Sequence, residues 1–334
     1  MTSVLGHLAL FAASLAVTFV AAGFFARRLD RIGLRLGLPE TLLGLLTALA
    51  ADAPEVSSAI TALAKGSQSA GIGVVVGSNV FNLAAMIGLS AVLRGPVRLR
   101  RESLAIEGAV GLAVTAVVAA VVADWLAPAA GLAIIAVVLV PYVALLVAGP
   151  AGVAKLPLRP RPKVFLRRMF GEGHAAERRL PAHRDALLLP MLTLVLAVAV
   201  IVAGSIGMVT AALTLADRWR VPHFVIGVVV LAVLTSLPNA FTAVRLGLQG
   251  RGSALLSETL NSNTINLVAG VAIPSLVLGL GTFTGLVAFD FGWLIATTVL
   301  ALVLLGTARG LGRGAGAALI FLYVAFLSEQ LAHL

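Results

Sequence analysis

Long apolar runs separated by short polar stretches repeat along the whole chain of 334 residues. Ten of these runs approach or exceed the roughly twenty residues that an α-helix needs to cross the hydrocarbon core of a bilayer. Their apolar residues are continuous and do not alternate with polar ones, which favours helices over the strands of a β-barrel. The runs lie near residues 4–25, 41–64, 70–93, 103–123, 127–148, 186–207, 222–246, 254–280, 285–305 and 315–333. The pattern predicts an all-α polytopic membrane protein with ten transmembrane helices.

The composition agrees with a membrane protein, because 60% of the residues are hydrophobic and 11% are charged. A soluble domain of this length could not bury so much apolar surface, so the lipid bilayer is the expected partner. The first run has neither a basic segment before it nor a small-residue cleavage site, and we interpret it as a retained span. The chain has no cysteine, which excludes disulfides and thiolate metal sites.

Basic residues lie almost entirely on one side of this topology. Twenty-one of the 24 Lys and Arg residues follow spans one, three, seven and nine or fall in the central stretch 149–185, and the other side holds only Lys65, Arg218 and Arg220. The positive-inside rule then places both termini outside and the central stretch in the cytoplasm, in an inner or plasma membrane. Because the excess follows the topology, the net charge of +10 does not indicate nucleic-acid binding.

The chain divides into two halves of nearly equal length, residues 1–148 and 186–334, each with five predicted spans. An odd number of spans in each half makes the halves enter the membrane in opposite directions, which is the layout of an inverted repeat. The Pro-, Arg- and Gly-rich stretch 149–185 is expected to be a solvated basic linker between them. No pattern in the sequence points to a particular oligomeric state.

Polar residues interrupt the second and seventh spans at the same place. Asp52 and Glu55 flank Pro54, and Thr235-Ser236-Leu237-Pro238-Asn239 lies 184 positions further on, counted from proline to proline. Ionisable groups at bilayer depth are costly and usually face a cavity or a partner, so they are functional candidates. Each proline also frees a backbone carbonyl about one turn earlier, near Ala51 and near Leu234.

The same shift of 184 aligns a second polar cluster in the next span of each half. Gly77-Ser78-Asn79 falls on Asn261-Ser262-Asn263, and Asn82 falls on Asn266. Small and amide side chains also hold transmembrane helices together, so one such cluster would carry little weight. Two clusters in register and in opposite topology favour a duplicated site, in motifs near 41–90 and 224–275.

The residue types in these motifs suit a hard cation, because Ca²⁺ takes roughly six to eight oxygen ligands. No histidine or cysteine lies near them, which disfavours a zinc- or copper-type site. Asp52 and Glu55 are the expected acidic ligands, and Asn79, Asn263 and Glu258 are accessory candidates. Glu258 has an alternative interpretation as an acid that caps its helix or pairs with Arg251. The cation-binding candidates are Asp52, Glu55, Ser78, Asn82, Thr235, Ser236, Asn239, Ser262 and Asn266.

The two copies resemble the α-repeats of the cation/Ca²⁺ antiporter superfamily, the group of sodium/calcium exchangers. In that family G-T-S-L-P-E is followed by G-S-N-x-x-N/D in each repeat. The resemblance implies ten helices in two inverted five-helix repeats, with a central site made by spans two, three, seven and eight and gated by spans one and six. The chain departs from the family at Asp52, where serine is usual, at Asn239, where a second glutamate is expected, and at Asn266, where some members carry aspartate.

The resemblance implies a secondary active antiporter that exchanges Ca²⁺, or a related cation, for Na⁺, with no other cofactor. A Ca²⁺/H⁺ antiporter is the alternative, because two carboxyl groups three residues apart repel one another and can share protons. The missing second glutamate also leaves open a non-transporting relict. An intramembrane enzyme is disfavoured, because the two acids lie on one helix and neither His-Glu-x-x-His nor Gly-x-Ser-x-Gly occurs.

Overall fold

The computed structural model describes residues 4–36, 48–49, 51–96, 100–170, 188–280, 285–306 and 310–332. Almost all of these residues form helices, and nine helical segments among them are long and apolar enough to cross a membrane. The prediction of an all-helical polytopic protein is therefore confirmed. The elements are α1 (Val4–Leu36), α3 (Ala53–Ala64), α4 (Gln68–Asn82), η1 (Leu83–Gly88), α5 (Leu89–Arg94), α6 (Arg101–Val122), α7 (Pro128–Lys155), α8 (Pro160–Phe170), α9 (Leu188–Trp219), α10 (His223–Val225), η2 (Ile226–Leu231), α11 (Ala232–Leu248), α12 (Gly252–Leu267), η3 (Val268–Ala272), α13 (Ser275–Leu278), α14 (Gly285–Leu305) and α15 (Arg313–Leu331), where η marks a π-helical turn.

Much of the first half of the second predicted span, 41–64, lies outside the described residues. Its described part is α3, which begins at Ala53 with Asp52 at the N-cap and Pro54 in the first turn. Proline is tolerated there because the first N–H groups of a helix have no partner within the helix. The break expected at Pro54 is therefore the start of a new helix. In the second half Pro238 lies inside the continuous helix α11.

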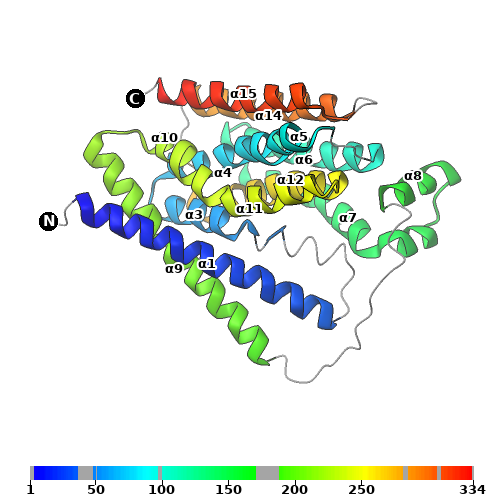
Figure 1. Cartoon of the computed structure of the whole chain (residues 1–334), viewed down its shortest axis with the longest axis horizontal. Helices are drawn as coiled ribbons and strands as arrows, with labels where there is room; N and C mark the ends of the chain where they lie inside the picture. Colours follow the sequence, from blue (N-terminus) through cyan, green and yellow to red (C-terminus); the bar gives the residue numbers. More distant parts are fainter. Residues whose placement is uncertain are drawn as a thin grey trace.

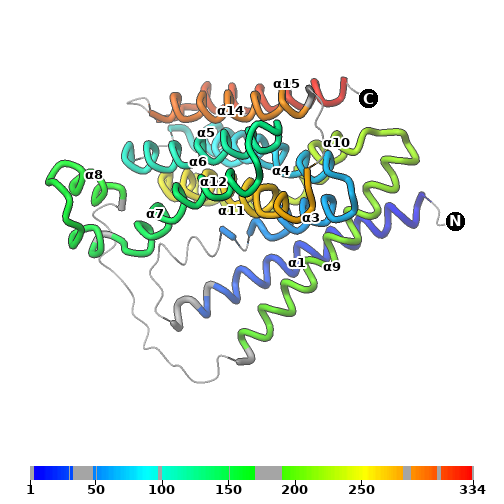
Figure 2. The backbone as a smooth tube through the Cα atoms, turned by 180° about the vertical axis from the view of Figure 1, so that it is seen from behind, coloured from blue at the N-terminus to red at the C-terminus, as the bar shows by residue number. Residues whose placement is uncertain are grey.

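The helices form three layers. Figure 1 shows α14 and α15 side by side on one face, α1 and α9 crossing one another on the opposite face, and α3, α4, α11 and α12 between them. In the view from behind in Figure 2, α6 lies beside α12, and α7 packs on α6 and α8 toward the side of the molecule. Both termini lie at the same end in Figure 1. This arrangement places the spans that carry the polar motifs at the centre.

Two regions differ from the expected boundaries. Arg27, Arg28, Arg31 and Arg35 were expected in a loop, but α1 continues to Leu36 and includes them. Arg28 Nε donates to Thr193 Oγ1 of α9 at 3.0 Å, so the basic end of α1 is held by a neighbouring helix.

Part of the expected linker is also helical. Helix α7 continues to Lys155 through a bend at Gly149, and α8 packs back against α6 and α7. The Ser103 hydroxyl donates to the Met169 carbonyl at 3.1 Å, which fixes the end of α8. The sequence did not predict these helices because an apolar run measures only the part of a helix that lies in lipid. The rest of the linker, 171–185, lies outside the described residues.

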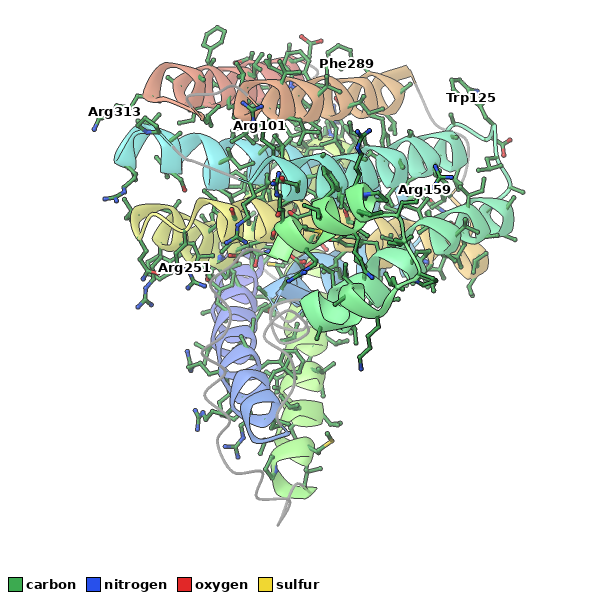
Figure 3. All side chains as sticks on the ribbon, turned by 90° about the vertical axis from the view of Figure 1, so that its right-hand side faces the viewer. Arg101, Trp125, Arg159, Arg251, Phe289 and Arg313 are labelled. Carbon is green, nitrogen blue, oxygen red and sulfur yellow. The ribbon has the colours of Figure 1, made fainter. Side chains whose placement is uncertain are left out.

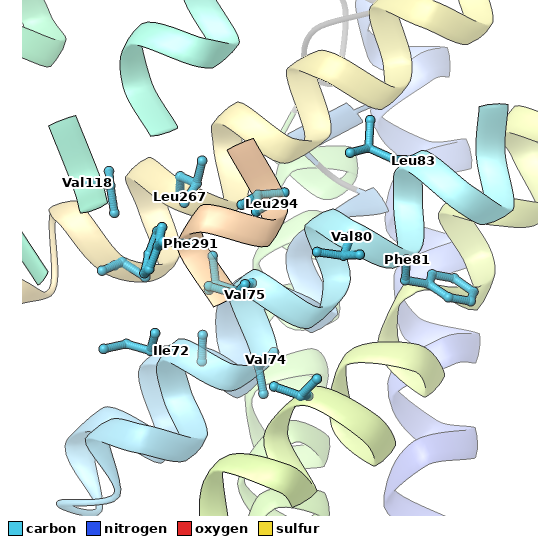
Figure 4. Packing of buried hydrophobic residues seen from close by; sticks show 14 of the residues in the cluster. Ile72, Val74, Val75, Val80, Phe81, Leu83, Val118, Leu267, Phe291 and Leu294 are labelled. Atoms are coloured by element: carbon cyan, nitrogen blue, oxygen red, sulfur yellow. The ribbon is translucent and has the colours of Figure 1, made fainter. Parts of the chain in front are cut away.

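Helix α4 runs through the densest part of the core. Figure 4 shows its Ile72, Val74, Val75 and Val80 surrounded by residues of other helices, among them Phe291. On another face, Gly73 and Gly77 allow the backbones to come close. A Cβ at Gly73 would lie 2.7 Å from the Phe224 carbonyl oxygen, and one at Gly77 would lie 2.7 Å from the Val228 carbonyl oxygen. The two glycines therefore let α4 pack directly on α10 and η2, as small residues four apart do in membrane helices.

Candidate cation site

Two carboxyl groups and one amide meet at the centre of the molecule. Asp52, at the start of α3, and Glu55, in its first turn, are both 0% exposed. Asn239 of α11 donates from Nδ2 to Asp52 Oδ1 at 2.6 Å and to Glu55 Oε1 at 3.0 Å. The two acids share a helix face because they are three residues apart. The residue that stands in place of the expected second glutamate therefore bridges both acids.

Helix α12 and helix α4 complete this cluster. Ser262 donates from Oγ to Asp52 Oδ1 at 2.5 Å and lies 3.5 Å from Asn239 Nδ2. Asn82 of α4 donates from Nδ2 to Ser262 Oγ at 3.2 Å and to Asn263 Oδ1 at 3.0 Å. All of these side chains are buried. One connected network thus joins α3, α4, α11 and α12, the helices that carry the motifs.

The two copies of the second motif contact each other reciprocally. Asn79 Nδ2 donates to the Asn263 carbonyl at 3.0 Å, and Asn263 Nδ2 donates to the Asn79 carbonyl at 3.1 Å. Asn266 Nδ2 lies 3.3 Å from Asn79 Oδ1. Asn79 and Asn263 are 184 residues apart, which is the offset of the sequence repeat. They hold α4 against α12 beside the acids.

The remaining hydroxyl candidates are buried, but two of them bond to the backbone. Ser78 Oγ donates to the Ala232 carbonyl at 3.4 Å, and Thr235 Oγ1 donates to the Leu231 carbonyl at 2.8 Å. Ser236 Oγ has no hydrogen-bond partner.

The two backbone candidates lie beside the break and the proline. Pro238 has no N–H to offer the carbonyl of Leu234, four residues earlier in α11. Ala51 directly precedes the turn at Asp52. The role of these two carbonyls as cation ligands stays a prediction.

Several oxygen atoms of the network have no partner although they are buried. They are Asp52 Oδ2, Glu55 Oε2, Asn82 Oδ1, Ser236 Oγ, Asn239 Oδ1 and Asn266 Oδ1. Buried polar atoms in native proteins are almost always hydrogen-bonded, so a group of orphaned acceptors needs an explanation. These are two carboxyl, three amide and one hydroxyl oxygen, the ligand types that hard cations take. The residues present therefore fit a transported cation such as Ca²⁺.

No basic side chain in the described part of the chain forms an ion pair with Asp52 or Glu55. Glu258, one turn before Ser262 on α12, is half-buried and near enough to both Asp52 and Arg251 to interact electrostatically. It makes no ion pair with Arg251 within the ranges that the structure describes. Both interpretations of Glu258, as an accessory ligand and as a partner of Arg251, stay predictions.

Some polar contacts around the site are made by residues that belong to neither repeated motif or whose partners lie outside the motifs. Glu107 of α6 accepts a hydrogen bond from Ser257 of α12 at 2.7 Å, and Tyr142 of α7 donates to Asn261 of α12 at 2.8 Å. These bonds hold the side of α12 that faces away from the acids. The Gly73-x-x-x-Gly77 spacing was readable in the sequence as a close-packing signal, but the partners of Glu107 and Tyr142 were not.

A comparison with protein-family models identifies the chain. The model of the sodium/calcium exchanger protein matches residues 6–148 and 189–332, which is most of the sequence. The chain belongs to the sodium/calcium exchanger family. This family consists of transporters and not of enzymes, so the intramembrane-enzyme alternative is set aside.

Individual relatives agree with this membership. The sodium/calcium exchanger MaX1 of Methanosarcina acetivorans is 33% identical over 135 residues, which cover 40% of this chain and 39% of MaX1. Among solved structures, the sodium-calcium exchanger NCX_Mj is 18% identical, with a TM-score of 0.59 over 98% of this chain and 99% of that one. The H⁺/Ca²⁺ exchanger CAX is 14% identical, with a TM-score of 0.72 over 96% of this chain and 82% of that one. The two structures share the fold of this family member.

Proposed function

We propose that this exchanger is a secondary active antiporter that moves Ca²⁺, or a related cation, against Na⁺ by alternating access. The observation that carries the proposal is the pair of buried acids, Asp52 and Glu55, which have no basic partner among the described residues but have orphaned oxygens around them. An unpaired buried carboxylate is costly, and a bound cation removes that cost. The acids would be the charged ligands, and the amide and hydroxyl oxygens would complete the shell.

Charge balance favours exchange of one divalent cation for two monovalent ones. Two carboxylates neutralise one Ca²⁺, and two Na⁺ or two H⁺ would restore the same balance. Na⁺ is the counter-ion that family membership supports first. H⁺ is the second candidate, because Asp52 and Glu55 lie close enough to share one amide and because the H⁺/Ca²⁺ exchanger CAX has a similar fold.

Asn239 is suited to serve the site in both the loaded and the unloaded state. Its Nδ2 donates to both acids, and its Oδ1 has no partner. An amide carries two donors on one side and an acceptor on the other. We expect Nδ2 to satisfy the acids when no cation is bound and Oδ1 to turn toward the cation when one arrives.

We also propose ten transmembrane helices in two inverted five-helix repeats, 1–148 and 186–334. The reciprocal Asn79–Asn263 bonds at an offset of 184 support this, as does the position of the π-helical turns η1 and η3 shortly after Asn82 and Asn266. Helices α1 and α9 lie against each other outside the central bundle, which suits a pair that slides to open the site to either side.

The orientation that we propose has both termini outside and the basic linker in the cytoplasm. The support for this orientation is the charge asymmetry, in which 21 of the 24 Lys and Arg residues fall on the linker side of the proposed topology. Figure 3 shows two of them, Arg251 and Arg313, on the same side of the view. A reporter fused after Leu334 should therefore be found outside the cytoplasm and one inserted near Gly173 should be found inside. The same compartment for both reporters would rule out the inverted arrangement.

The transport proposal is tested with purified protein in liposomes. Radiolabelled Ca²⁺ uptake is followed with an outward Na⁺ gradient and, separately, with a pH gradient, which distinguishes the two counter-ions. Glu55→Gln should abolish uptake under both gradients. Glu107→Gln removes an equally buried acid that bonds to Ser257 outside the site, and it should retain most of the uptake.

Wild-type protein with no cation-driven uptake of any kind would support a non-transporting relict. Unaltered uptake by Glu55→Gln would remove that residue from the site. Equal losses in Glu55→Gln and Glu107→Gln would show that burial of an acid, and not its place in the network, decides transport.

A further inference from the structure

A further buried acid, outside the central network, lies between α14 and α15. Asp290, in the second turn of α14, is 0% exposed, and so is Gln330, in the last turn of α15. Gln330 donates from Nε2 to Asp290 Oδ1 at 2.8 Å. Asp290 Oδ2 and Gln330 Oε1 have no partner. In Figure 1 this helix pair forms the face of the molecule opposite α1 and α9.

Asp290 Oδ2 and Gln330 Oε1 could hydrogen-bond to each other if one of them carried a proton. A protonated carboxyl group and a primary amide can form a ring of two hydrogen bonds, in which N–H donates to one carboxyl oxygen and the O–H donates to the amide oxygen. The first of these bonds is present between Gln330 Nε2 and Asp290 Oδ1. A proton on Oδ2 would supply the second and would give both remaining atoms a partner. We propose that Asp290 and Gln330 form a proton-binding site that joins α14 to α15.

The atoms at this place suit a proton better than a metal ion. A hard cation needs roughly six oxygen ligands, whereas the pair offers only Asp290 Oδ2 and Gln330 Oε1. The Tyr323 hydroxyl also has no partner, but it belongs to a residue two helical turns before Gln330. An ionised carboxylate held by one neutral amide would be expensive at this depth, and protonation removes the charge.

Among the described residues, no positively charged side chain forms an ion pair with Asp290. Glu329, an acid, is the charged residue near enough to act on it electrostatically. Helix α14 carries no other ionisable residue, and α4 and η1, which pack on it, carry none. The ionisable residues of the other packed helices are Arg101, Glu102 and Glu107 on α6 and Arg313, Tyr323 and Glu329 on α15.

The pair also has a structural route to the central helices. The Tyr323 ring packs edge-on against Phe81 with centroids 5.5 Å apart, and Phe81 precedes Asn82 on α4. Helix α15 packs on η1 and α5, which continue from α4. Uptake or loss of the proton would therefore change how firmly α14 and α15 hold the helix that carries part of the cation site.

Infrared spectroscopy of the purified full chain tests the site without any transport measurement, so its result is independent of the exchange proposal. At neutral pH the wild type should show a carbonyl stretch from the protonated Asp290 carboxyl, and Asp290→Asn should remove the intensity of one such group. Gln330→Met keeps the acid and should shift the band to higher frequency, because the carboxyl loses its amide partner. Glu107→Gln, the matched control, should leave this band in place.

Thermal unfolding gives a second measurement. Asparagine can form the same ring with Gln330 without a proton, so Asp290→Asn should melt within about one degree of the wild type at low pH. Because raising the pH removes the proton from the wild type only, the variant should become the more stable of the two. A wild-type spectrum that Asp290→Asn and Gln330→Met both leave unchanged would overturn the proposal. A constant difference in melting temperature across pH would overturn it as well.

Discussion

Replacement of Asn239 by alanine tests whether one amide holds both acids in the absence of a cation. The change removes the donor that Asp52 Oδ1 and Glu55 Oε1 share, at 2.6 and 3.0 Å. Asp52 would keep its bond from Ser262 at 2.5 Å, whereas Glu55 Oε1 would lose the donor that Asn239 supplies. Both acids would stay buried, so the loss should appear directly as reduced stability.

The magnitude follows from the two lost bonds. Hydrogen bonds to charged groups contribute about 1.5–3 kcal/mol in soluble proteins. Measured interhelical bonds in a membrane protein average about 0.6 and reach about 1.7 kcal/mol, because the reference state in lipid also finds partners. The membrane values apply here and give about 1–3 kcal/mol for the pair. At about 2 °C per kcal/mol for a chain of this size, Asn239→Ala should lower the melting temperature by roughly 2–6 °C.

Calcium should reduce the difference in melting temperature between Asn239→Ala and the wild type. A bound cation satisfies the acid oxygens itself, so the missing amide matters less in the loaded state. Saturating Ca²⁺ at a hundred times the dissociation constant stabilises a protein by about 2.7 kcal/mol. Asn239→Ala also removes Oδ1, one of the roughly six to eight oxygens that Ca²⁺ takes. Because this loss is smaller than the loss of two hydrogen bonds to the acids, the gap in melting temperature should still narrow when Ca²⁺ is bound.

The assay is thermal unfolding in detergent, with and without Ca²⁺, and Asn261→Ala is the matched control. Asn261 has the same side chain on α12 but accepts its bond from Tyr142, away from the acids. Its loss of stability should be the same with and without Ca²⁺. The reasoning is refuted if Asn239→Ala is as stable as the wild type without Ca²⁺, or if Ca²⁺ leaves the gap unchanged.

Two further predictions concern the site and the packing around it. Asn239→Glu should bind Ca²⁺ more tightly and release it more slowly, because a third acid strengthens divalent binding, and the added change Asp52→Ser should restore exchange with a greater Na⁺ dependence. Ca²⁺ flux is measured against Na⁺ concentration and pH for each single variant and for the double variant. Simply additive effects of the two changes would show that positions 52 and 239 do not share one ion. Gly77→Val should cost about 1–3 kcal/mol, because its Cβ would meet the Val228 carbonyl oxygen at 2.7 Å, whereas Gly292→Ala, which has no neighbour within 4 Å, should melt like the wild type.

The position of the site could be predicted from the sequence because its chemistry is rare at bilayer depth. Asp52 and Glu55 stand out in an apolar run, and the repeated Ser-Asn-x-x-Asn cluster identifies the helix that packs beside them. The structure brings Asp52, Glu55, Asn82, Asn239 and Ser262 into one network, as that pattern predicted. Their role as cation ligands stays a proposal.

The pairing of side chains could not be predicted, because it depends on helix rotation. Nothing in the pattern indicates that Asn239 donates to both acids, or that Ser78 bonds to the Ala232 carbonyl. The contact between Asp290 and Gln330 joins residues 40 positions apart and carries no motif. The end of α1 at Leu36 was missed for a different reason, since its last turns are polar and hydropathy does not follow a helix beyond the lipid.

The proposed site has two acids although the expected second glutamate is absent. Asp52 supplies the second carboxyl group beside Glu55, and two carboxylates would balance one divalent cation. Both acids now lie on α3, and their mutual repulsion cannot be relieved by moving α3 away from α11. Asn239 reduces that repulsion by donating to both at once, and it does so from the opposite repeat. We therefore propose that the amide at position 239 and the acid at position 52 compensate one another, since α11 supplies the donor and α3 supplies the charge.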